Sequence, residues 1–108
     1  ATPATHISTS NDFKLFLHPH VVLLQNNSLY FSAIAVRRDT SAQLLVGTIL
    51  DQSFKPKTIT TSLFDLPHTP AHHSLSTCGT DRLLVMIDNM LVMFQQNWAV
   101  IWARIYTS

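Results

Sequence analysis

The chain has 108 residues, of which 46% are apolar and only 12% are charged, whereas a soluble domain usually carries roughly 25% charged residues. The net charge is +1 and the few basic residues are scattered, which argues against a nucleic-acid-binding protein because phosphates need a basic patch. No glutamate occurs, and Ser and Thr together number 22, a composition that suits strands and turns and predicts an all-β fold with one small core.

The first half of the chain predicts a flexible arm followed by a β-meander. Residues 1–11 are small, polar and low in hydrophobicity, so we expect a flexible N-terminal arm there. A first meander unit follows over residues 12–66 and opens with a strand at Phe13–Leu17, which the prolyl sequence His18–His20 is expected to end. The next turn is predicted at Asn26–Asn27, because Asn tolerates the positive φ of tight hairpins.

Three further strands and a loop complete this half. Alternating or continuous apolar residues predict strands over 28–36, 43–50 and 57–66. Residues 67–80 begin with Pro67 and Pro70, which fit poorly into a continuing strand, and are expected to form a proline- and histidine-rich loop with one short strand.

Residues 81–108 predict a second meander unit. Three apolar runs are separated by two or three polar turn formers, as in a meander of three buried strands. One long helix from Asp81 is the alternative, because the polar residues recur about every seven positions. A transmembrane helix over 83–106 is disfavoured, because it would bury Asp88 and several amides in hydrocarbon.

The chain also contains an internal similarity. Residues 22–31 align with residues 84–93 at an offset of 62, and each copy is followed by another apolar strand. The pattern resembles two successive blades of a WD40-like β-propeller, in architecture only, because the Gly-His and Trp-Asp marks are absent and the offset exceeds the usual repeat of roughly 40 to 50 residues. Two blades cannot close a ring, so this hypothesis needs a larger protein or other chains. A self-contained small β-sandwich or barrel is the alternative. The units together, residues 12–108, are expected to form one compact domain.

Four residues are candidates for metal binding. His68, His72, His73 and Cys78 carry ligand atoms that zinc prefers, but their spacing matches no standard zinc module. A solvated polar loop is the favoured interpretation, and no metal or other cofactor is expected.

Catalytic motifs are missing from the sequence. There is no GxSxG around the serines, no glutamate for paired-carboxylate chemistry, and only two glycines with which to build a phosphate-binding loop. We therefore expect no enzyme activity and no catalytic residues.

One aromatic constellation suits recognition. Trp98, Trp102, Arg104 and Tyr106 are predicted to share one strand face, and these residue types dominate binding hot spots. The alternative is that this face packs against a second sheet, with Arg104 at its rim.

The sequence thus predicts a non-enzymatic protein–protein interaction or structural module within a larger assembly. Its partners would be other protein chains or the remaining part of a larger protein, with no nucleic acid and no membrane span. The alternatives are a small independent β-barrel or sandwich that binds an apolar ligand and, ranked lower, a metal-dependent enzyme that uses the His68, His72 and His73 loop. The sequence leaves the cellular location open, although a single cysteine is compatible with a reducing compartment, and an intracellular location is therefore favoured.

Overall fold

The computed structural model describes residues 13–24, 28–52 and 55–106, with the side chains of 50–52 and 55–60 outside the described part. The predicted arm at 1–11 and the predicted turn at Asn26–Asn27 lie outside the described residues.

The described chain is all-β and contains no helix, so the long-helix alternative for the C-terminal third is wrong. Eight strands form two four-stranded antiparallel sheets, and in each sheet consecutive strands are neighbours. The strands are β1 (Phe13–Leu23), β2 (Ser28–Arg37), β3 (Ala42–Gln52), β4 (Lys55–Leu66), β5 (His73–Cys78), β6 (Arg82–Ile87), β7 (Met90–Gln95) and β8 (Val100–Ile105). No described segment is a helix that could cross a membrane.

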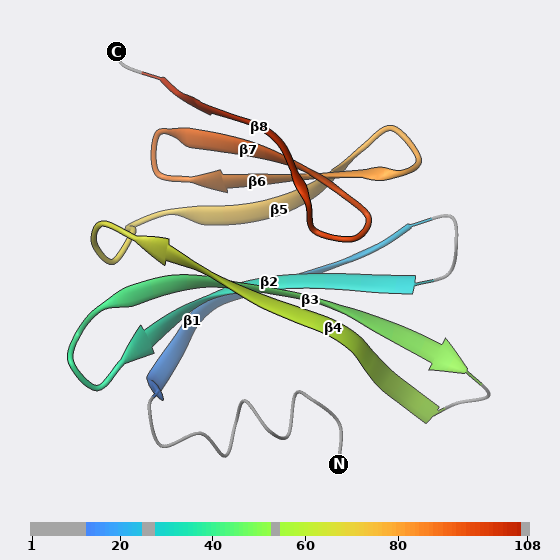
Figure 1. Cartoon of the computed structure of the whole chain (residues 1–108), viewed down its shortest axis with the longest axis horizontal. Coiled ribbons are helices and arrows are strands. Elements are labelled where there is room, and N and C mark those ends of the chain that lie inside the picture. Colours follow the sequence, from blue (N-terminus) through green and yellow to red (C-terminus); the bar gives the residue numbers. More distant parts are fainter. Residues whose placement is uncertain (1–12, 25–27, 53–54, 107–108) are drawn as a thin grey trace.

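The two sheets are separate layers, consistent with a small β-sandwich. The barrel alternative is wrong, because among the described residues no strand of one sheet pairs with a strand of the other. Figure 1 shows the strong twist of the first sheet, with β5 as the strand of the second sheet that lies nearest to it. Strand β5 contacts β1 and β2. The connection over residues 67–72 therefore leads from β4, at one edge of the first sheet, to β5, which lies beside β1 at the other edge.

Strand β1 continues through the sequence that was predicted to end it. It spans His18 and Pro19, and its pairing with β2 shifts register between Leu17 and His20. His18 adopts a φ of 51°, which accommodates the irregularity. Because β1 is an edge strand, it can contain Pro19, which has no N–H to donate, at the point where its pairing with β2 is interrupted.

The internal similarity is one strand out of phase with the sheets. The offset of 62 superposes the β1–β2 hairpin on the β6–β7 hairpin, whereas by position in the sheets β1 corresponds to β5 and β2 to β6. The second sheet begins at His73, so the short strand expected within 67–80 is its first strand. All hairpins of a meander share the pattern of apolar strand, polar turn and apolar strand, which explains why the sequence alignment slipped.

The hydrophobic core lies between the sheets. Ile34, Val46, Leu83 and Val85 are fully buried there, and Phe94 is only 1% exposed. The side chains of Phe64, Leu66 and Met90 pack against this core and are only partly buried.

Candidate interaction surfaces

Both sheets present apolar side chains on the faces that point away from the core. Residues that pair across neighbouring strands share a face, so the register identifies the outer face of each sheet. On the first sheet, one row runs Val21, Phe31, Gly47, Thr61 and another runs Ala33, Leu45, Leu63. We define the first outer face by these two rows together with Phe16, Leu23, Leu29, Ala35 and Ile49.

Several side chains of the first outer face are open to solvent. Leu23 is 60% exposed, Val21 58%, Leu63 40% and Phe16 37%. Such exposure of large apolar groups on one sheet face costs free energy in water at about 25 cal/mol for each Å². This surface is therefore a candidate contact surface.

One end of the first outer face is polar. The Arg37 Nε donates to Gln43 Oε1 at 2.8 Å, and the Gln43 Nε2 donates to Asp65 Oδ1 at 2.7 Å. Asp65 lies on edge strand β4 and is exposed, so its carboxylate has acceptor capacity left for another donor.

The second sheet has an outer face of similar character. The register places Leu84, Met86, Leu91, Met93 and Trp102 together, and we define these as the second outer face, with Arg104 at its rim. Met86 is 43% exposed, and the Arg104 guanidinium lies 4.8 Å from the centre of the Trp102 ring.

The predicted aromatic constellation is divided by the structure. Trp98 is 3% exposed and packs in the core, where its ring meets those of Tyr30 and Phe94 edge to face. Its Nε1 donates to Thr48 Oγ1 at 3.1 Å. Trp98 is thus separated from Trp102 and Arg104, which lie on the second outer face.

A bulge in β8 explains the division. Val100 pairs with Phe94 and Trp102 pairs with Met93, so two steps along β8 match one step along β7. Side-chain alternation is therefore interrupted between Trp98 and Trp102. Tyr106 follows the end of β8, is 51% exposed, and donates its backbone N–H to Asn89 O at 2.7 Å.

The contact candidates Val21, Leu23, Leu63 and Met86 were missed by the sequence analysis. The available signal was the occurrence of apolar residues on both faces of one strand, as in Val21–Leu24, because a strand with one wet face alternates instead.

His73 holds the two sheets together instead of binding solvent. Its Nδ1 donates to His18 O at 2.8 Å, and its Nε2 lies 2.8 Å from Ser32 Oγ, from which it accepts. The His20 Nε2 in turn donates to His73 O at 2.9 Å. Burial lowers the pKa of His73 below its ordinary value, although the bond to His18 O acts in the opposite direction. A neutral imidazole protonated on Nδ1 fits these partners.

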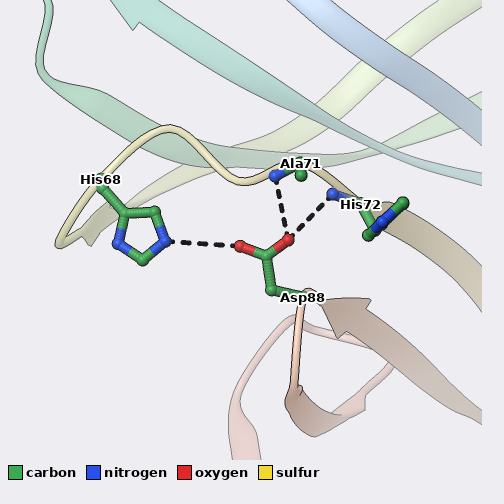
Figure 2. Close-up of polar contacts among 4 residues, drawn as sticks. All are labelled: His68, Ala71, His72 and Asp88. Carbon is green, nitrogen blue, oxygen red and sulfur yellow. Dashed lines mark hydrogen bonds and ion pairs between the residues drawn. The ribbon is translucent and has the colours of Figure 1, made fainter.

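His68 and His72 lie around Asp88, at the turn between β6 and β7 (Figure 2). The Asp88 Oδ1 accepts from the backbone N–H groups of Ala71 and His72, each at 2.9 Å, and the His68 Nε2 lies 3.4 Å from Asp88 Oδ2. The N–H of His72 is the main cause that lowers the pKa of Asp88, and the N–H of Ala71 and the His68 side chain act in the same direction.

The four metal candidates are not brought together. His73 uses both ring nitrogens in hydrogen bonds, and Cys78 lies at the opposite end of β5 from it. Among the described residues, no group of three or more His, Cys, Asp or Glu side chains is arranged to hold a metal ion.

An apolar groove opens between the sheets on the side of β4 and β8. A cavity of about 190 Å³ is lined by residues that include Phe64, Val92, Val100 and Ala103. A second cavity, of about 120 Å³, shares Leu66, Ile87 and Met90 with it.

Comparison with known proteins gives no relative from which a function could be transferred. No protein-family model, no curated protein and no solved structure matches this chain.

Proposed function

We propose that this protein is a non-enzymatic interaction module that works inside a larger protein assembly. The observation that carries the proposal is that each sheet has apolar side chains on both faces and that large ones on the outer faces, such as Val21, Leu23 and Met86, are exposed. Other outer-face residues are buried, namely Ala33, Ala35, Leu45 and Met93. Contiguous apolar patches of more than a few hundred Å² are rare on monomeric soluble proteins and mark interaction sites.

The arrangement of the sheets supports a blade-like role. Each sheet is a four-stranded meander, the sheets are closest at β1 and β5, and the connection over 67–72 leads from the last strand of one sheet to the first strand of the next. Successive blades of a β-propeller are stacked in this way, and every blade of the closed ring is covered on both faces by its neighbours. This is a likeness of architecture, and a two-sheet module needs additional blades or partners to cover its outer faces.

The second candidate function is binding of a small apolar ligand in the groove between β4 and β8. The apolar lining of that groove favours it. Its cavity of about 190 Å³ is smaller than the roughly 300 to 1,000 Å³ typical of small-molecule pockets, so this function ranks below the first. A metal-dependent enzyme ranks lowest, because His73 has no free ring nitrogen with which to bind a metal.

Binding of a hydrophobic dye to the folded monomer tests the proposal. The chain is diluted until sedimentation shows a monomer, and cooperative urea unfolding verifies that it is folded. We expect strong dye fluorescence in the wild type and a clear reduction in the double variant Val21→Lys with Leu63→Lys, because both side chains are exposed on the first outer face.

The matched control is Thr80→Lys, in the exposed turn between β5 and β6, which should leave dye binding unchanged. A folded monomer that binds no dye would contradict the proposal. If Val100→Phe abolishes the fluorescence and the double variant does not, the dye binds in the groove. That result would favour the ligand-binding alternative.

A further inference from the structure

We infer that the partner on the outer faces is a second copy of this chain, stacked head to tail, with the second outer face of one copy against the first outer face of the next. This inference rests on the proposed function and names its partner. It follows from the relation between β4 and β8 within one chain, combined with the charges on their outward sides.

The groove fixes how β4 and β8 lie relative to each other. Leu66 and Ile105 line one cavity, and Phe64 and Ala103 line the adjoining one. The two strands therefore run in the same direction, as Figure 1 also shows, and the end of β4 lies across the groove from the end of β8.

The residues between these pairs point to the outer faces, since side chains alternate along a strand. Asp65 and Leu63 thus lie on the first outer face near the end of β4, and Trp102 and Arg104 lie on the second outer face near the end of β8. Asp65 pairs across its sheet with Gln43, and Arg104 with Leu91, which places both on outer faces. Both charged side chains are exposed.

If the stacking of the two sheets is repeated between copies, complementary groups meet. Arg104 of one copy then faces Asp65 of the next, and the ring of Trp102 faces Leu63. The same step brings the apolar residues of the second outer face, such as Met86, over those of the first.

Such a contact joins two different surfaces, so each copy keeps one surface free for the next copy until a ring closes. Propellers close with about four to eight blades, so two to four copies of this two-sheet chain would be sufficient. The expected assembly is a closed particle of two to four chains of 12.2 kDa each, with no growth beyond that size.

Charge exchange at the pair tests the inference. Sedimentation velocity is measured for the wild type, Asp65→Arg, Arg104→Asp and the double variant that carries both changes. We expect the wild type to form the closed particle, each single variant to associate at least about tenfold more weakly, and the double variant to regain association, because the pair is restored with its charges exchanged.

Asp81→Arg, in the exposed β5–β6 turn, is the matched control for a reversed charge and should associate like the wild type. Cooperative urea unfolding of each single variant verifies that it is folded.

A wild type that stays monomeric up to about 100 µM, or an assembly that both single variants leave intact, would overturn the inference. A monomer that still binds the hydrophobic dye would overturn only the identity of the partner, whereas a monomer without dye binding would contradict the proposed function as well.

Discussion

His73 is the residue whose role departs most from its sequence context. It follows a proline-containing loop and another histidine, so the sequence favoured a solvated position or, less so, a metal ligand. In the fold it is 8% exposed, and its ring bonds to His18 O and Ser32 of the other sheet. These partners lie 55 and 41 positions away along the chain, and no local sequence pattern predicts contacts between residues so far apart.

The buried imidazole makes stability depend on pH. Because burial lowers the pKa of His73 from its ordinary 6.5, the unfolded chain binds a proton on this residue at a higher pH than the folded chain does. Its contribution to stability is therefore complete above about pH 6.5 and is lost as the pH falls through the lowered pKa of the folded state.

Urea unfolding between pH 7.5 and pH 5 measures this effect. We expect the free energy of unfolding of the wild type to decrease as the pH is lowered. The decrease should be smaller in His73→Gln, which has no titrating ring at that position. His72→Gln, which changes the exposed neighbour, should keep the wild-type pH dependence. An equal loss in all three proteins would exclude His73 as the cause.

Strand β8 and the turn before it show how one bulge changes the assignment of a face. The sequence pattern predicted bulky rings together on one side. The extra residue in β8 and the positive φ of Trp98, 64°, send Trp98 into the core and leave Trp102 on the second outer face. A bulky residue rarely adopts such a φ, so sequence reasoning has no reason to expect it.

Alanine substitutions distinguish the two tryptophans. Trp98→Ala should lower the free energy of unfolding by about 3 to 5 kcal/mol, because it removes a large buried ring and leaves Thr48 without its donor. Trp102→Ala should cost less than about 1 kcal/mol in the monomer while weakening association. Urea unfolding and sedimentation check the two effects, and a Trp102→Ala chain that fails to fold would place Trp102 in the core instead.

The connection from β4 to β5 depends on Asp88. Its carboxylate accepts the N–H groups of Ala71 and His72, and it occupies a turn position with a φ of 51° that Asp tolerates better than Ala. In Asp88→Ala, amide exchange at these two residues should become faster, as hydrogen–deuterium exchange resolved by NMR would detect. Asp81→Ala should leave both amides unchanged, and unchanged exchange in Asp88→Ala would contradict this role.

The strand content and the meander order of the protein could be predicted from its sequence, because short polar turns connect sequence neighbours within each sheet. The place of β5 as the first strand of the second sheet could not, since the hairpins resemble one another and the similarity at an offset of 62 superposed the wrong pair. The closure of the sheets into a barrel was also left open by the sequence, because alternation along a strand is the same in a barrel and in a sandwich.

The structure shows where the few charged side chains lie relative to the outer faces. Charged side chains normally protect exposed strands from pairing with other chains. Here the described part of each outer face is apolar over its middle, and charges such as Asp65 and Arg104 stand at the edge strands. The composition thus agrees with surfaces that are covered in the functional protein.

Hydroxyl-radical footprinting, with the chain concentrated and then diluted below its association range, tests the central claim that the outer faces are contact surfaces between copies. We predict that oxidation of Phe16, Met86 and Trp102 is slower in the concentrated sample, while His72, in the exposed connection, reacts at the same rate in both. Equal oxidation rates of the three outer-face residues at both concentrations would contradict the account.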